Sequence, residues 1–210
     1  MSDSPGMVVI PCQNTIAVQT VTALMQLQLP PGSSLRPIQE WTSPAEKRNH
    51  AISILLATPH LGWAFFCDSD MLPPPDTVRR LLATGCDVVG GLYTGRVFDP
   101  QGGGIVYGFE CGYVDRDNRP VMPEVVDQLA PVDWVGAGAL LVRRHVLEKL
   151  APGPWFGNHG QDDIDFCGAA RAAGFSVHVD GRVPVGHLQL VPVMPGASMF
   201  LDLNLKSKPL

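Results

Sequence analysis

The sequence lacks several features that would assign it to common classes of protein. It has no apolar run near the roughly 20 residues that a membrane-spanning helix needs, so we expect no transmembrane segment. Its first residues carry neither the basic start nor the apolar stretch of a signal peptide. The five cysteines are odd in number and include no C-x-x-C pair, which indicates a reducing compartment. These features predict a cytoplasmic protein.

Familiar nucleotide-binding motifs are missing as well. There is no P-loop, and Gly136-Ala137-Gly138 lacks the third glycine of a dinucleotide loop and continues as a strand. The formal net charge of −5 gives no general attraction to nucleic acid or to an anionic membrane. Any phosphate must therefore be bound by individual groups at one site, and we expect a small-molecule partner and no nucleic acid.

What remains is a chain with ample material for one α/β domain. It has 210 residues, of which 45% are hydrophobic. Apolar strand patterns alternate with helical patterns along most of it. The expected strands are 7–10, 35–41, 62–67, 87–93, 132–142, 175–179 and 183–187, and the expected helices begin near residues 14, 44, 77, 144 and 162. Glycine and proline punctuate residues 95–130, which predicts hairpins that leave the sheet.

The acidic tripeptide Asp68-Ser69-Asp70 stands directly after the apolar run 62–67. Carboxylates at the mouth of a buried strand repel each other and lose hydration unless a cation or hydrogen-bond donors satisfy them. Mn²⁺ or Mg²⁺ supplies the missing charge and takes its other ligands from water and phosphate. The alternative is a loop that caps the next helix, but three prolines delay that helix.

A capping box, Ser43-Pro44-Ala45-Glu46, predicts a helix whose apolar face includes Arg48 and Asn49. In a strand-helix-strand unit such a helix begins beside the carboxyl ends of the strands, where ligands bind. We therefore expect Arg48 and Asn49 to face the same crevice as the acidic tripeptide. The alternatives are an arginine that extends to solvent and an asparagine that caps a local group.

Further candidates lie later in the chain. Asp162 and Asp163 open a helix, where acids are favoured by the macrodipole but can also act as a general base and its neighbour. His187 ends an apolar strand and is placed to join Asp68 and Asp70 around a metal. Gly91 lets a ligand approach the backbone, and Trp134, like Tyr93, either stacks on a sugar or base or packs in the core.

The order of these motifs resembles that of the GT-A-fold glycosyltransferases, in particular family 2-like enzymes. The resemblance runs from Val8 to His187 and rests on Asp68-Ser69-Asp70-Met71, Val88-Val89-Gly90-Gly91, Trp134-Val135-Gly136-Ala137-Gly138, Gln161-Asp162-Asp163-Ile164-Asp165-Phe166-Cys167 and Val185-Gly186-His187. It implies a Rossmann-like α/β/α sandwich with a mainly parallel sheet and a small hairpin excursion. It also implies a UDP- or GDP-linked sugar donor, Mn²⁺ or Mg²⁺, and transfer to a hydroxyl acceptor by a hexosyltransferase.

The resemblance further implies roles for individual residues. Asp70 and His187 would bind the metal, with Asp68 assisting or touching the ribose. The turn from Pro11 to Gln13, together with Arg48, would hold the nucleotide. Asp163 matches the base of inverting members. Asp162 stands where the family has glutamate, the acidic turn after the first strand is missing, and the anomeric outcome stays open.

The resemblance predicts one domain, 1–210, with a nucleotide-binding half (1–94), an acceptor-side half (95–187) and a tail that forms a lid or an oligomer contact (188–210). The oligomeric state stays open. Two other functions also remain open. A nucleotidyltransferase or pyrophosphate-handling enzyme would use a similar crevice but normally needs more basic residues, and a non-catalytic sugar- or nucleotide-binding module would keep the fold without the activity.

Overall fold

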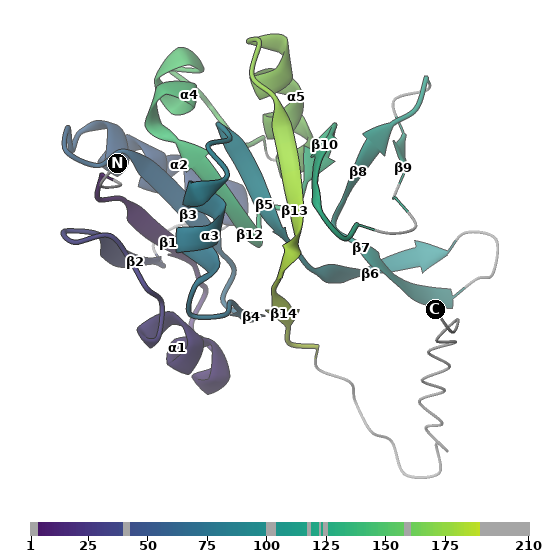
Figure 1. Cartoon of the computed structure of the whole chain (residues 1–210), viewed down its shortest axis with the longest axis horizontal. Coiled ribbons are helices and arrows are strands. Elements are labelled where there is room, and N and C mark those ends of the chain that lie inside the picture. The colour runs from purple at the N-terminus through teal and green to yellow at the C-terminus, as the bar shows by residue number, and fades with distance from the viewer. Residues whose placement is uncertain are drawn as a thin grey trace.

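The molecule is built on a seven-stranded sheet, with strand order β10-β13-β5-β12-β3-β1-β2 (Figure 1). The computed structural model describes residues 4–39, 43–99, 104–116, 119–121, 123, 126–157 and 161–189. The strands are β1 (Met7–Pro11), β2 (Ser34–Ile38), β3 (Trp63–Cys67), β5 (Val88–Leu92), β10 (Leu129–Val132), β12 (Ala139–Arg143) and β13 (Val177–Pro184). Only β12 and β10 run opposite to the other five, so the sheet is mainly parallel, as predicted.

Helices cover both faces of this sheet because its strands are apolar on both sides. In β1, Met7 and Val9 pack toward one helical layer while Val8 and Ile10 pack toward the other. The first layer holds α2 (Pro44–Leu56), α4 (Arg144–Lys149) and α5 (Asp162–Ala172), and the second holds α1 (Val18–Met25) and α3 (Thr77–Ala83). In the described part of the chain, none of these helices has the length and apolar character of a membrane span.

The capping signal at Ser43 is confirmed. The Ser43 hydroxyl accepts a hydrogen bond from the Glu46 N–H at 3.1 Å, and the Glu46 carboxylate accepts one from the Ser43 N–H at 3.1 Å. The first helix begins later than expected, because α1 covers Val18–Met25 and the sequence predicted a start near residue 14. Tertiary hydrogen bonds engage the flanks instead: the Ala17 N–H donates to the Ser69 carbonyl, and the Gln28 N–H to the Pro75 carbonyl.

The hairpin excursion is present. It comprises the hairpin β6–β7 and a small sheet, β11-β8-β9, beside the main sheet (Figure 1). The bounds are β6 (Thr94–Asp99), β7 (Gly104–Phe109), β8 (Cys111–Val114), β9 (Pro120–Val121) and β11 (Trp134–Val135).

Two expectations about later strands are wrong. The stretch 132–142 is not one strand, because β11 belongs to the small sheet and the turn 136–138 precedes β12 in the main sheet. The expected closing strands 175–179 and 183–187 divide differently, because one long strand, β13, covers Val177–Pro184, with a shift of register between Asp180 and Pro184. After it, β14 (Gly186–His187) pairs with β4 (Met71–Leu72). Residues 190–210 of the expected tail lie outside the described residues.

Candidate active site

Arg48 joins two acidic segments that are far apart in the sequence. The acidic tripeptide follows β3 as expected, and Asp68 Oδ1 lies 2.7 Å from Arg48 Nη2. The other end of the guanidinium, Nη1, lies 2.6 Å from Oδ2 of Asp162 at the start of α5. Arg48 is only 4% exposed, so α2 inserts a buried cation between the two carboxylates.

This arrangement gives Asp68 a partner from within the protein. Burial opposes the charge on Arg48, but Asp68 and Asp162 outweigh burial and raise its pKa. The prediction that Arg48 shares a crevice with Asp68 is thereby confirmed. The positive charge beside Asp68 is a guanidinium, whereas the sequence pointed to a metal ion there.

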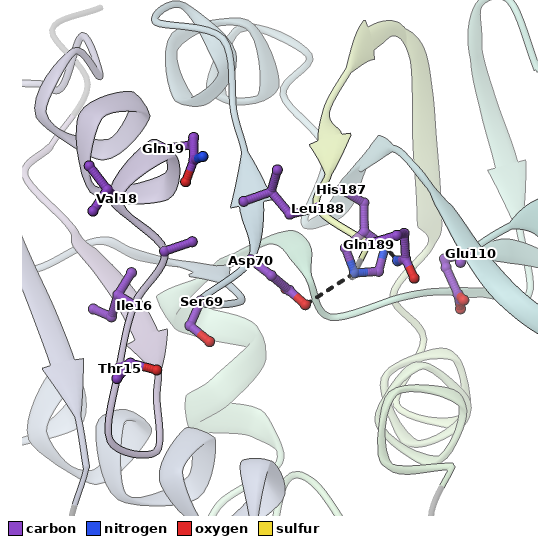
Figure 2. A pocket seen from close by; sticks show the side chains of 12 residues that line it. Thr15, Ile16, Val18, Gln19, Ser69, Asp70, Glu110, His187, Leu188 and Gln189 are labelled. Atoms are coloured by element: carbon purple, nitrogen blue, oxygen red, sulfur yellow. Dashed lines mark hydrogen bonds and ion pairs between the residues drawn. The ribbon is translucent and has the colours of Figure 1, made fainter. Parts of the chain in front are cut away.

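The second acid of the tripeptide lies beside His187. Because β14 pairs with β4, His187 stands opposite Met71, and its Nε2 lies 3.4 Å from Asp70 Oδ2 (Figure 2). Its Nδ1 lies 2.8 Å from the Thr94 carbonyl oxygen and 3.0 Å from the Gln189 side-chain nitrogen, which leaves Nε2 as the ring nitrogen directed to Asp70. The hydrogen bond with Asp70 is the main cause that raises the pKa of His187.

Asp70 and His187 form a donor pair that suits a divalent ion. A carboxylate oxygen and an imidazole nitrogen fixed by a carbonyl are typical ligands of Mn²⁺. Asp68 is turned to Arg48, and in the described parts of the chain no group of three or more His, Cys, Asp or Glu side chains is placed to hold a metal. The structure thus brings together two of the three predicted ligands, and phosphate and water would have to complete the shell.

Two cavities adjoin this pair. The larger has a volume of about 860 Å³ and lies between the loop before α1 and the segment after β14 (Figure 2). The smaller, about 290 Å³, contains Arg48 and the acids around it. Glu110 and His187 line both. The larger cavity is lined by Thr15, Ile16, Ala17, Val18, Gln19, Ser69, Asp70, Gly95, Glu110, His187, Leu188 and Gln189.

The acids in the smaller cavity differ in their partners. Asp162 is bound to Arg48, whereas the Asp163 carboxylate accepts a hydrogen bond from the Ile164 N–H at 2.9 Å. Burial, and then the charge of Asp162, raises the pKa of Asp163. A carboxylate with a raised pKa that faces a cavity is a candidate general base.

Glu110 was not expected in the site. It links β7 to β8, and burial, followed by the charge of Asp163, raises its pKa. It belongs to no recognisable motif. The one signal in the sequence is a carboxylate placed between Phe109 and Cys111, in a stretch of apolar β-prone residues where a charge needs a reason.

Tyr93 forms part of the wall of the smaller cavity and is otherwise buried. Its hydroxyl accepts a hydrogen bond from the Gly138 N–H at 3.0 Å, and its ring meets the ring of His187 edge-on, with centroids 5.7 Å apart. Gly136 is needed here, because an added Cβ would overlap the Tyr93 hydroxyl. The glycines therefore serve the packing of Tyr93 behind the histidine.

Three predicted nucleotide contacts lie elsewhere. The Asn49 amide donates to the Phe156 carbonyl at 2.8 Å and accepts from the Trp155 and Phe156 N–H groups, so it fastens a loop outside the acidic crevice. Trp134 is buried and donates to the Tyr113 carbonyl. The space above Gly91 is occupied by side-chain and backbone atoms of Val183 and Val185.

Pro11 and Gln13 directly precede, in the sequence, a segment that lines the larger cavity. Pro11 is buried at the carboxyl end of β1, and Gln13 is exposed two residues before the loop segment 15–19 that forms one wall of that cavity. Neither residue lines the cavity itself.

Sequence comparison finds no matching protein-family model and no matching curated protein. Solved structures of similar fold do exist. The crystal structure of A197 from STIV has a TM-score of 0.63 and 18% identity, over 89% of this chain and 86% of that one. The crystal structure of GalNAc-T7 with UDP, GalNAc and Mn²⁺ has a TM-score of 0.59 and 9% identity, over 89% of this chain and 44% of that one. This chain thus spans less than half of the GalNAc-T7 chain, and its fold is GT-A-like.

Proposed function

We propose that this protein is a metal-dependent glycosyltransferase that moves a sugar from a UDP- or GDP-linked donor to a hydroxyl acceptor. The observation that carries the proposal is the position of the Asp70–His187 pair on a GT-A-like fold. The pair borders a large cavity, and His187 also lines a small cavity that contains Asp163. The proposal assigns the donor to one cavity and the acceptor to the other, with a candidate metal site and a candidate base beside them.

The larger cavity is the proposed donor site. Its volume is within the range of roughly 300–1,000 Å³ typical of small-molecule pockets. Asp70 and His187 would hold Mn²⁺ or Mg²⁺ there, and Pro11 and Gln13 would approach the nucleotide from the end of β1. When bound, the metal supplies Lewis-acid stabilisation of the charge that develops on the departing diphosphate.

The smaller cavity is the proposed place of acceptor activation. In an inverting transfer, Asp163 takes the proton of the acceptor hydroxyl, the acceptor oxygen forms a bond to the anomeric carbon, and the bond from that carbon to the diphosphate breaks. The nucleoside diphosphate leaves with the bonding electrons. Asp163 suits the role better than Asp162 because Arg48 already pairs with Asp162. Through its ion pair with Asp162, the first residue of α5, Arg48 positions the start of that helix.

The first test concerns nucleotide binding with and without metal. We expect Asp70→Asn to weaken the binding of UDP or GDP in the presence of Mn²⁺ at least about tenfold, measured by calorimetry, because one of two protein ligands is neutralised. Without metal the affinities of the variant and the wild type should be similar. Unchanged affinity in Mn²⁺ would remove Asp70 from the site.

A matched control exists in the same chain. His145 Nε2 lies 2.8 Å from Asp87 Oδ1, an aspartate–histidine pair whose residues line neither cavity. Asp87→Asn should leave nucleotide binding intact.

The reaction type is tested by incubation with nucleotide sugars. Slow hydrolysis of a bound nucleotide sugar to the nucleoside diphosphate and free sugar would support transfer chemistry. Release of a sugar phosphate would indicate nucleotidyl or pyrophosphate chemistry, and binding without turnover a non-catalytic module.

A further inference from the structure

Glu110 is held rigidly at the junction of the two cavities. Its N–H donates to the Tyr93 carbonyl at 3.0 Å, and its carbonyl accepts from the Gly136 N–H at 2.7 Å. These bonds fix the backbone between β7 and β8, and the side chain lines both the larger and the smaller cavity. Figure 2 shows it across from Asp70, on the far side of His187.

The Glu110 carboxylate accepts no hydrogen bond from the described residues, although the charge of His187 favours its ionised form. No side chain or backbone group there hydrogen-bonds to it, although it is half-buried. It packs closely against the backbone of Gly95, where an added Cβ would overlap its oxygen. A half-buried carboxylate that accepts no hydrogen bond has lost part of its hydration without compensation. A ligand that donates a hydrogen bond would compensate this loss.

The charges around Glu110 are unbalanced. Arg48 pairs with Asp68 and Asp162, which leaves Glu110 and Asp163 without an arginine, lysine or histidine hydrogen bond in the part of the chain that the structure describes. An anionic group placed beside them would meet two carboxylates whose charge is offset only through space, by His187 for Glu110 and by Arg48 for Asp163. A sugar hydroxyl would instead supply the donor that Glu110 needs.

The location also decides which part of a substrate Glu110 meets. This step rests on the proposed function. The anomeric carbon must lie next to the diphosphate on one side and the acceptor oxygen on the other. The transferred sugar therefore occupies the junction of the cavities, which Glu110 and His187 line.

We propose that Glu110 is a specificity-determining residue that accepts a hydrogen bond from a hydroxyl of the transferred sugar and excludes acidic sugars from the site. The substrate class is thus a nucleotide-linked neutral sugar, with uronic acids rejected by charge. Specificity of this kind depends on the repulsive contact as much as on the attractive one.

The test compares donors that differ only at C6 of the sugar, where the neutral member has a hydroxymethyl group and the acidic member a carboxylate. UDP-glucose with UDP-glucuronate, UDP-galactose with UDP-galacturonate and GDP-mannose with GDP-mannuronate are suitable pairs, and the nucleotide that binds with Mn²⁺ decides which is used. For the wild type we expect the neutral member to bind at least about tenfold more tightly than the uronate. In Glu110→Gln the ratio should fall to about threefold or less, mainly because the uronate binds better.

A second variant tests the same carboxylate without removing it. Gly95→Ala would push the Glu110 carboxylate aside, and should reduce the discrimination in the same direction. Glu148→Gln is the control, because Glu148 is exposed and pairs with Arg144 away from both cavities. It should keep the wild-type ratio.

The outcomes separate this inference from the proposed function. If the nucleotide alone binds with Mn²⁺ but the ratio in wild type is near one, or is unchanged in Glu110→Gln, the role of Glu110 is refuted while the donor site stands. If neither UDP nor GDP binds, the proposed function fails and the role of Glu110 fails with it.

Discussion

At the scale of single residues, Asp163 shows how a reactive group opposes folding. Its pKa is raised by burial and by Asp162, so the folded protein binds this proton more readily than the unfolded chain does. Its favourable contribution to stability is therefore complete below the usual aspartate pKa and is lost as the pH rises through the folded pKa. At neutral pH the ionised side chain is a net burden, despite the helix N-terminus.

Asp163→Asn should therefore stabilise the unliganded protein while it impairs catalysis. At pH 7 we expect a gain on the order of 1 kcal/mol in the free energy of unfolding, which disappears toward pH 4, measured by urea denaturation across pH. Donor binding should persist, and turnover should fall by about 10²–10⁴-fold. Asp165→Asn in the same helical turn, but exposed, should show neither effect. Near-normal turnover in Asp163→Asn would reduce Asp163 to a helix-terminal acid.

At the scale of elements, the turn between β11 and β12 controls the wall behind His187. Gly136→Ala should destabilise the protein by about 1–3 kcal/mol, because the new Cβ overlaps the Tyr93 hydroxyl. Tyr93→Phe should also destabilise it by about 1–3 kcal/mol, because the buried Gly138 N–H loses its acceptor.

The two changes should not add. In the Tyr93→Phe background the hydroxyl that blocks the new Cβ is absent, so Gly136→Ala should cost at least about 0.5 kcal/mol less there than in the wild type. A thermal-denaturation double-mutant cycle measures this coupling. Strict additivity would mean that the turn relaxes independently of Tyr93.

At the scale of the whole molecule, segments from early and late in the chain alternate within one sheet. β12 lies between β3 and β5, and β13 lies on the other side of β5. Residues 1–94 alone would leave β3 and β5 without the strand that joins them. The predicted nucleotide-binding and acceptor-side halves should therefore fold as one cooperative unit.

Fluorine labels on tryptophan can test this unity. Trp63 is in β3, within the predicted nucleotide-binding half, and the buried Trp155 follows α4, within the predicted acceptor-side half. Each tryptophan therefore reports on one half. In urea we expect both native signals to disappear at the same midpoint. Leu141→Ala, in the centre of β12, should move both midpoints together and cost about 2–5 kcal/mol. Separate midpoints would show that the halves unfold independently.

Local patterns in the sequence were sufficient to locate much of the framework. The apolar run before Asp68 is β3, the capping box starts α2, and the acidic pair at Asp162 opens α5. These features depend on periodicity and on bonds within a few residues, so neighbouring residues specify them. The inward direction of Arg48 followed from the same helical period.

The partners of these side chains depended on contacts between distant segments. Because α5 lies near the end of β3, Arg48 pairs with both Asp68 and Asp162. Because β14 pairs with β4, His187 lies beside Asp70 and forms no ion pair with Asp68. Glu110 lies in the site because the junction between β7 and β8 borders both cavities. A carboxylate pairs with whichever cation or hydrogen-bond donor the folded chain places beside it. The local sequence pattern therefore does not predict the partner.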